Sequence, residues 1–384
     1  MSSMSHSLQP AVSPAGGASL RGSRLRTAAR LLLDEGPLSR ATLARRSGYS
    51  PASMTATIRD LVHLGLVMDT GKASTTGGRP ASLLGFDRSA VLMTLLSFTD
   101  HRLTASQIDL SGHELVRIVR DVKHLDTPGV LTEALHTLSA AAAKPSRCVA
   151  VSLPGVVAAD GSVSSAPAVG LKSSMELRSH LGEVTGLPVL IENDVNLLAL
   201  GEAARGAAKD RDDVGLVYIG AGIGGAVVRE GKIEPGATRS AGEIGFLPYG
   251  GVWAAPGDTE GPFEREWSLA AVNARLIRDG LDWESVTAAT PVVDAALDAW
   301  SYAALVTCCV ADPATIVFAG DVCELPQGVL DELTRRVTSR SPHPVDVAFA
   351  WLGQGGVAAG VVELVSSNAE LFLPDPSPTN HLYP

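Results

Sequence analysis

Residues 189–196 of this chain read VLIENDVN, three apolar residues followed by a segment with two acids and two amides. A carboxylate held beside an amide suits a polyol, because Asn193 can hydrogen-bond a hydroxyl while Asp194 accepts its proton. The same Asn-Asp-x-Asn pattern also forms helix-capping turns that need no ligand. The eight residues alone leave both interpretations open, so the surrounding sequence has to decide.

Alternating strands and helices are expected on both sides of this segment. Apolar runs predict strands at 91–96, 103–110, 116–122, 148–153, 214–219 and 315–319, a hairpin at 227–232, and helices at 127–142 and 356–365. This alternation indicates an α/β body. The glycine-rich Gly220–Gly225 follows one strand, but a single glycine loop is weak evidence for a nucleotide and can simply allow close packing.

The N-terminal part of the chain has a different pattern. Apolar spacing predicts a helix over 25–33, ended by Gly36-Pro37. Ser39 can cap a second helix, which stops at Gly48. Ser50-Pro51 can open a third, since a serine cap and a first-turn proline satisfy or remove free amide donors. Two short helices joined by a glycine-containing turn predict a helix-turn-helix.

A wing is expected after the third helix. Residues 66–68 and 81–86 read as strands on either side of Gly77-Gly78-Arg79-Pro80. An arginine held between glycine and proline can enter a narrow minor groove, although out of context Arg79 would be an ordinary turn residue. The third helix, 51–64, would present hydroxyls and a guanidinium to a major groove. The predicted DNA contacts are Arg40, Ser50, Ser53, Thr55, Thr57, Arg59 and Arg79.

The net charge of −10 is unevenly distributed. Residues 20–85 hold ten Lys/Arg and four Asp/Glu, which gives +6, and residues 86–384 carry −16. A basic segment joined to an acidic remainder is typical of a nucleic-acid-binding module on an acidic body. A basic helical face that only keeps the segment solvated would give the same charges, so charge alone does not decide.

Cysteine usage and the N-terminus favour a soluble cytoplasmic protein. The cysteines show neither metal-ligand spacing nor a disulfide framework, and we expect buried thiols at Cys148, Cys308, Cys309 and Cys323. Residues 1–19 have no basic segment or long apolar run and are expected to be a disordered tail rather than a signal peptide. No apolar run approaches the roughly 18 residues of a membrane span.

Taken in order, these segments resemble the ROK family (repressors, open reading frames and sugar kinases). The resemblance covers nearly everything from about residue 20 to 365 and rests on GPLSRATLARRSGYSPASMTATIRDLVHLGLV, GGRP, LPGVV, GLPVLIENDVNLLALGEA, YIGAGIGGAVV, GKIEPGATRSAGEIG and IVFAG. It implies an α/β fold in which an N-terminal winged helix-turn-helix precedes a two-lobed, actin-like (ribonuclease H-like) body with a sugar cleft between the lobes. The implied division is a tail (1–19), a DNA-binding domain (20–86) and a sugar-kinase-like domain (90–384).

The resemblance also assigns roles to residues of the body. Asn193 and Asp194 match the sugar contact and catalytic base of the family, and Glu243 and Glu264 match glutamates that hold sugar hydroxyls. Two carboxylates that each accept from neighbouring hydroxyls can grip a hexose. Without this context, both glutamates could equally form surface salt bridges.

Departures from the family argue against kinase activity. The phosphate loop Asp-x-Gly-Gly-Thr of the kinases aligns with Ser97, Phe98, Thr99, Asp100 and His101. The glycines that let backbone amides approach phosphate are absent, and Asp100 would repel a nucleotide. In the second glycine loop, Ala221 stands where the kinases have a threonine.

The zinc site of the family is also absent from the sequence. Phe246 replaces its histidine and Gly250–Gly261 contains no cysteine, so we expect no zinc and a loop held through Trp253 and Phe263. The missing histidine also contacts sugar in relatives, and Ala168 replaces an asparagine, so at least two polar sugar contacts are lost.

Together these features predict a DNA-binding transcriptional regulator, a repressor whose body senses a sugar or sugar derivative. We expect no enzymatic activity, cofactor or membrane association, and a cytoplasmic homodimer or tetramer that binds double-stranded operator DNA. Two alternatives stay open. One is a regulator without ligand that acts through dimerisation or a protein partner, and the other is a sugar kinase with an accessory DNA-binding module.

Overall fold

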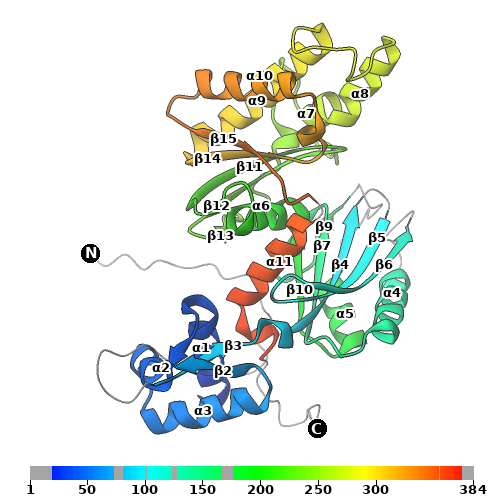
Figure 1. Ribbon diagram of the computed structural model, residues 1–384. Coiled ribbons are helices and arrows are strands. Elements are labelled where there is room, and N and C mark those ends of the chain that lie inside the picture. The colour runs from blue at the N-terminus through cyan, green and yellow to red at the C-terminus, as the bar shows by residue number, and fades with distance from the viewer. Residues whose placement is uncertain are drawn as a thin grey trace.

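A head and a two-lobed body make up the computed structural model, which describes residues 20–72, 81–99, 102–122, 128–166, 176–353 and 355–373 (Figure 1). The head lies at one end of the molecule, and each lobe is built on its own sheet. This arrangement confirms the predicted order of a helical head followed by an α/β body.

Three helices and a small antiparallel sheet form the head. Its helices are α1 (Leu20–Glu35), α2 (Arg40–Ser47) and α3 (Pro51–His63), and its strands, in the order β1-β3-β2, are β1 (Leu38–Ser39), β2 (Val67–Lys72) and β3 (Ser82–Phe86). Helices α2 and α3 are the predicted helix-turn-helix, and β2 and β3 are the predicted wing strands. Strand β1 was not predicted, because two residues carry no detectable period and become a strand only by pairing with β3.

Helices α2 and α3 begin, and α2 ends, at the residues that the sequence predicts. Ser39 Oγ accepts from the Thr42 amide at 3.1 Å, and Ser50 Oγ accepts from the Ser53 amide at 3.2 Å. Gly48 ends α2 with a φ of +73°, a left-handed conformation that glycine adopts at little steric cost. These caps confirm that the helix ends are encoded in neighbouring residues.

The first lobe contains a mixed five-stranded sheet in the order β10-β7-β4-β5-β6. Its strands are β4 (Leu92–Thr99), β5 (Arg102–Asp109), β6 (Glu114–Asp121), β7 (Cys148–Leu153) and β10 (Val189–Asn193). Helices α4 (Pro128–Ala141) and α5 (Leu177–Thr185) share one buried cluster with this sheet. The short helix η1 (Arg88–Ala90) joins the head to β4, and the hairpin of β8 (Val156–Val157) and β9 (Val163–Ser165) follows β7.

The second lobe contains a five-stranded sheet in the order β13-β12-β11-β14-β15. Its strands are β11 (Asp213–Ile219), β12 (Ile223–Arg229), β13 (Lys232–Ile233), β14 (Thr315–Ala319) and β15 (Asp346–Phe349). Its helices are η3 (Ile244–Phe246), α7 (Pro262–Trp267), α8 (Leu269–Arg278), α9 (Pro291–Ala311), η4 (Asp321–Glu324) and α10 (Gln327–Arg340). Strand β12 starts earlier than the predicted 227, because its glycines continue the antiparallel pairing with β11.

Helix α9 is long and apolar enough to cross a membrane by length and composition, but half of its apolar window is buried in the protein. Trp300, at its centre, is fully buried in the hydrophobic cluster of the second lobe. Helix α9 is therefore a core helix of that lobe.

The expected burial of the cysteines is confirmed for Cys148 and Cys308 and is wrong for Cys309, which is exposed; Cys323 is half-buried. Consecutive residues of a helix point about 100° apart. Cys309 therefore leaves the core although its neighbour Cys308 lies in it.

Two helices lie between the sheets, α6 (Asp194–Arg205) and α11 (Gly355–Ser367) (Figure 1). Helix α6 packs against β11 and β12, and α11 packs along α6. The short helix η5 (Ala369–Leu371) follows α11 and contacts α1 of the head. Among the described residues, η1 and the C-terminal end of α11 both connect the body to the head.

Candidate functional site

The junction of β10 and α6 positions the first two predicted site residues. Asn193 is the N-cap of α6, and its Oδ1 accepts from the Asn196 amide at 3.0 Å. Its Nδ2 donates to the Gly155 carbonyl at 3.1 Å. The helix-capping interpretation is therefore correct for Asn193, and these bonds fix its side chain in one orientation.

Asp194 begins α6 with an unusually basic carboxyl group. Burial, with a smaller contribution from the nearby Glu243, raises its pKa to about 6, against the opposing effect of the Val195 amide, which donates to Oδ1 at 2.9 Å. A carboxyl group with this pKa exchanges its proton close to neutral pH.

Glu243 lies close enough to act electrostatically on both Asp194 and Glu264, although the three residues are far apart in the sequence. Burial raises the pKa of both glutamates, and repulsion from Glu243 contributes to the shifts of Asp194 and Glu264. None of the three carboxyl groups forms an ion pair with a described residue. The salt-bridge alternative for the two glutamates therefore finds no partner in the described part of the chain.

The carboxylate of Glu264 is bound to the end of the glycine-rich loop between β11 and β12. Glu264 Oε2 accepts from the Ile223 amide at 2.7 Å. A Cβ on Gly222 would lie 3.0 Å from the same oxygen. One carboxylate oxygen of Glu264 is thus committed to the loop, and the other has no partner among the described residues.

Close backbone contacts hold the loop that carries Glu243 against this region. A Cβ on Gly242 would overlap the carbonyl oxygen of Gly225, and a Cβ on Gly261 would overlap that of Gly245. Gly242 and Gly261 thus allow close packing that a side chain at either position would prevent.

Sequence reasoning missed Arg239, which ties the two lobes together beside the site. Its Nε donates to the Val157 carbonyl at 2.9 Å, and its guanidinium pairs with the carboxylate of Glu192. Glu192, 3% exposed, also accepts from the Asn193 amide and from Asn196 Nδ2. A charged residue inside an apolar strand requires a buried partner, so Glu192 was the signal that could have led to this pair.

The positions that depart from the kinases are only partly described. Ser97 lies in β4, where it pairs in register with Thr104 of β5 and Ser152 of β7. It is therefore extended strand rather than phosphate loop. Asp100, His101 and Ala168 lie outside the described residues.

The expected packing of the 250–261 loop is confirmed for Phe263 and wrong for Trp253. Trp253 is 75% exposed, whereas Phe263 is 1% exposed and meets the Tyr249 ring at 5.8 Å. Tyr249 also contacts Tyr302, whose hydroxyl donates to the Pro248 carbonyl at 3.1 Å. The loop is therefore held by an aromatic cluster of Phe263 from α7, Tyr302 from α9 and Tyr249, and Trp253 takes no part in it. The described residues contain no cluster of three His, Cys, Asp or Glu side chains able to hold a metal.

The structure describes every predicted DNA-contacting residue except Arg79, and these residues lie in α2 and α3 or at their ends. Arg40, Ser50, Thr55 and Arg59 are exposed and Ser53 is half-buried. The predicted exposure of Thr57 is wrong, because this residue is 5% exposed and its hydroxyl donates to the Ser53 carbonyl at 2.9 Å. Helical periodicity places it on the same face as the core residues Met54 and Leu61. Arg79 lies outside the described residues.

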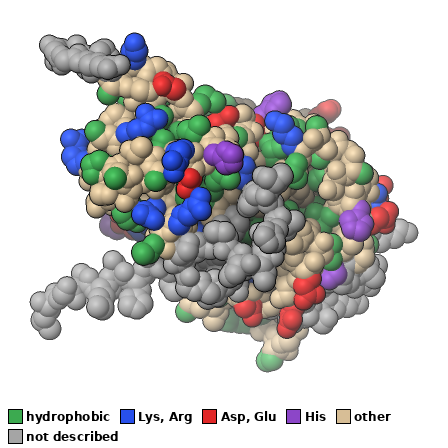
Figure 2. All heavy atoms as spheres, turned by 90° about the horizontal axis from the view of Figure 1, so that it is seen from below, with side chains coloured by type: hydrophobic (Ala, Val, Ile, Leu, Met, Phe, Trp, Pro, Cys, Tyr) green, Lys and Arg blue, Asp and Glu red, His purple; other side chains and the backbone are tan. Residues whose placement is uncertain are grey.

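Basic side chains gather on the exposed face of the head (Figure 2). Three head arginines pair with head acids: Arg21 with Asp60, Arg30 with Asp34, and Arg46 with Glu35. Arg40, Arg45 and Arg59 are exposed and form no ion pair with a described residue. The excess charge of the head is therefore available to an external anion.

Comparisons with known proteins place these observations in a family. The family model described as ROK family matches residues 101–368. The xylose repressor of Bacillus subtilis (strain 168) is 25% identical over 225 residues, 56% of this chain and 58% of the repressor. The DNA-binding transcriptional dual regulator NagC of Escherichia coli (strain K12) is 29% identical over 230 residues, 57% of this chain and 55% of NagC. The matches thus span little more than half of each curated relative.

Solved structures show the same fold. A crystal structure of a ROK family transcriptional regulator, a homolog of the E. coli MLC protein, has a TM-score of 0.76 at 21% identity, covering 92% of this chain and 98% of that one. A ROK family glucokinase from Streptomyces griseus, in complex with glucose and AMPPNP, has a TM-score of 0.56 at 21% identity, covering 71% and 98%. These likenesses confirm the predicted two-lobed, actin-like body.

Proposed function

The chain belongs to the ROK family, and from this premise we propose that it is a DNA-binding transcriptional regulator, a repressor whose body senses a sugar or sugar derivative. The proposal rests on Arg40, Arg45 and Arg59, which are exposed and form no ion pair with a described residue. Phosphate neutralisation by Lys and Arg supplies most of the non-specific affinity for DNA. The exposed hydroxyls of α3 supply groups that can bond to base edges.

The proposed domains follow the predicted boundaries, with a tail at 1–19, a DNA-binding head at 20–86 and a sensing body at 90–384. The protein would act in the cytoplasm as a homodimer or tetramer. Two heads related by symmetry would then read two half-sites of one operator. Arg40, Ser50, Ser53, Thr55, Arg59 and the wing residue Arg79 are the proposed DNA contacts, and Thr57 is no longer among them.

The effector site of this proposal is formed by Asp194, Glu243 and Glu264, with Asn193 beside them. Carboxylates without basic partners are suited to accept hydrogen bonds from the hydroxyls of a sugar. The raised pKa values of Asp194 and Glu264, which are half-buried, indicate that their charges are incompletely solvated in the free protein. A ligand that donates hydrogen bonds would stabilise the ionised forms.

Two observations count against a kinase. Ser97 is part of a hydrogen-bonded strand where a phosphate loop would be needed. In the second glycine loop, the amide of Ile223 already binds the Glu264 carboxylate, an anion that would repel phosphate. A glycine loop binds phosphate through free, convergent amides, so we propose that the body has no kinase activity.

One observation favours the alternative of a regulator without ligand. Phe246, at the position of the sugar-contacting histidine of the relatives, is 37% exposed and offers no polar contact. Such a body would act by dimerisation or by contact with a protein partner.

Capture of sheared genomic DNA from the source organism on the purified protein, followed by sequencing, tests the DNA-binding role. We expect a sharp palindromic site beside transport or catabolic genes. Recovery of diffuse fragments that disappears at moderate salt would indicate phosphate contact without specificity and would count against an operator.

Calorimetry with a panel of sugars tests the sensing role. We expect binding heat that disappears in Glu243→Ala and in Glu264→Ala. Heat from no sugar on the panel would favour the alternative without ligand. A coupled phosphorylation assay over the same panel should show no turnover. Turnover that is abolished by Asp194→Ala would support the sugar-kinase alternative.

A further inference from the structure

Helices α6 and α11 are in backbone contact along their lengths. A Cβ on Gly201 of α6 would overlap the Gly356 carbonyl oxygen of α11, and a Cβ on Gly360 would overlap the Leu197 carbonyl oxygen of α6. At these two points no side chain separates the two helix backbones. Backbones in such contact resist sliding or separation, because packed interiors tolerate little change in volume.

A buried carboxylate and an ion pair reinforce the α6–α11 contact. Glu202 of α6 is fully buried, and its Oε1 accepts from the Leu352 amide, just before α11, at 3.0 Å. Its Oε2 accepts from the Ala207 amide at 2.7 Å. Further along, Arg205 pairs with Glu363 of α11 at 3.0 Å. The two helices are therefore expected to move as one body.

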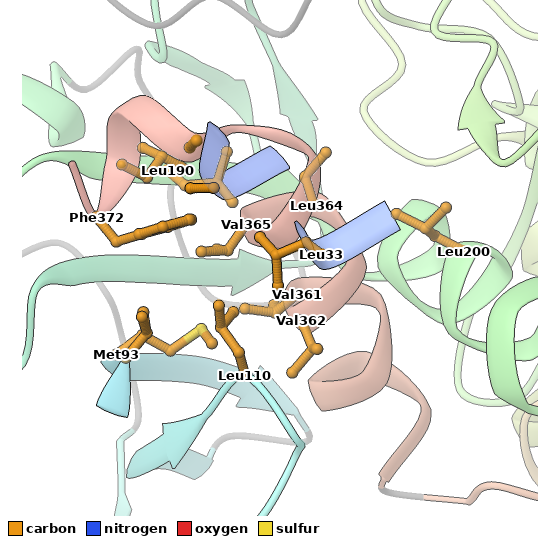
Figure 3. Packing of buried hydrophobic residues seen from close by; sticks show 14 of the residues in the cluster. Leu33, Met93, Leu110, Leu190, Leu200, Val361, Val362, Leu364, Val365 and Phe372 are labelled. Atoms are coloured by element: carbon orange, nitrogen blue, oxygen red, sulfur yellow. The ribbon is translucent and has the colours of Figure 1, made fainter. Parts of the chain in front are cut away.

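The far end of this helix pair is fastened to the head. Phe372, which follows η5 and is fully buried, meets the Phe86 ring of β3 edge-on at 5.9 Å. Arg26 of α1 donates to the Leu373 carbonyl at 3.3 Å. Leu33 of α1 lies in one buried cluster with Val361 and Phe372 (Figure 3).

The head is also fastened to the first lobe, by different residues. Arg147, just before β7, donates to the Leu64 carbonyl at the end of α3, at 3.3 Å. Arg88 of η1 donates to the Leu33 carbonyl at 3.1 Å. The head thus rests on two supports, the first-lobe sheet and the α11 end, and a shift of one support relative to the other would turn it.

We propose that the α6–α11 pair is the element that transmits occupation of the Asp194 site to the DNA-binding head, and that residues 368–373 are its coupling segment. Helix α6 begins at Asp194, and α11 ends against the head. This inference rests on the proposed function. It requires that effector-free and effector-bound states differ in the position of the pair relative to the first lobe.

Hydrogen exchange of the full-length protein tests the coupling without DNA or effector. Asp194→Asn is a mild perturbation at the start of α6, and Gly201→Ala is a stronger one inside the α6–α11 contact. Gly328→Ala on α10 is the matched control, because a Cβ there meets nothing within 4 Å. We expect Gly201→Ala to accelerate exchange in α6, α11, α1 and β3 by about tenfold, which corresponds to about 1.4 kcal/mol. Asp194→Asn, which removes a poorly solvated charge, should slow exchange in the same elements at pH 7, and the control should change none of them.

Phe372→Leu separates coupling from general loosening, since it keeps an apolar side chain and removes the contact between the two rings. In this background the two perturbations should still change the exchange rates of α6 and α11, but the added response of α1 and β3 should vanish. A head response that persists in the Phe372→Leu background, or no head response while α6 responds, would overturn the coupling.

Operator fragments from the genomic capture give a second, independent readout. We expect Gly201→Ala to change operator affinity about tenfold and Gly328→Ala to leave it unchanged. If the capture yields no operator, the proposed DNA-binding function would be wrong, but the hydrogen-exchange result would be unaffected. An unchanged affinity in Gly201→Ala would remove the coupling and leave the regulator in place.

Discussion

Replacing Arg239 by alanine is expected to destabilise the body far more than the loss of an equally close ion pair on the surface. Arg239 and Glu192 have side chains that are 15% and 4% exposed. Without the Arg239 guanidinium, the Glu192 carboxylate would keep hydrogen bonds from the Asn193 amide and Asn196 Nδ2, and Arg178 would be a nearby positive charge that forms no ion pair with it among the described residues. A buried charge without a counter-charge is among the most unfavourable groups that a protein can contain.

The expected loss in the free energy of unfolding is about 3–5 kcal/mol, the range for removing one partner of a buried pair. The lost bond from Arg239 Nε to the Val157 carbonyl adds about 1 kcal/mol. Arg211→Ala is the matched control, because Arg211 pairs with Asp346 at 2.7 Å while both side chains are more than half exposed. The control should lose about 0–1 kcal/mol, since water screens an exposed pair.

Urea unfolding of the parent and both variants, followed by tryptophan fluorescence, measures the difference. Arg239→Ala should lower the midpoint several times more than Arg211→Ala. Equal and small losses would show that Glu192 is well solvated, and would refute the argument that burial rather than distance sets the strength of this pair.

Four further predictions concern the site and the head. The raised pKa of Asp194, about 6 against 3.8 in the unfolded chain, means that the folded state keeps a proton that the unfolded state has lost, so stability falls as pH rises through this window. Asp194→Asn should therefore be more stable than the parent at pH 7 and equal to it near pH 4, in urea midpoints measured across pH. Arg59→Ala should weaken operator binding and reduce the slope of log K against log salt by about 1, whereas the paired Arg30, replaced by alanine, should leave the slope unchanged. Thr57→Val should not change operator affinity in a gel-shift titration, and a loss would show that α3 is seated differently in the head. Gly261→Ala should cost at least about 1–3 kcal/mol in thermal unfolding, because its Cβ would overlap the Gly245 carbonyl oxygen; an unchanged melting temperature would contradict that contact.

Local signals determined the helices of the head and several strands of the body. The caps at Ser39 and Ser50 and the apolar runs at 148–153 and 315–319 gave element positions that the structure confirms. These signals act between residues a few positions apart, through one hydrogen bond or one period of side chains. A sequence can display such relations directly.

Resemblance to the family supplied the residues of the candidate site, but only the tertiary structure brought them together. Asp194, Glu243 and Glu264 belong to different elements, and Glu243 acts on both of the others only because the folded chain brings these elements together. Burial of Thr57 and exposure of Trp253 were decided in the same way, by which neighbours cover each side chain.

The sequence by itself determined the helix ends, the α/β class and the basic character of the head. Only the tertiary structure decided the pairing of Glu192 with Arg239 and the docking of Leu373 against Arg26, residues 347 positions apart. The physical reason is the separation along the chain over which each interaction acts. Caps and periodicity are short-range properties of the chain, whereas buried pairs and docked segments depend on which distant surfaces exclude water together.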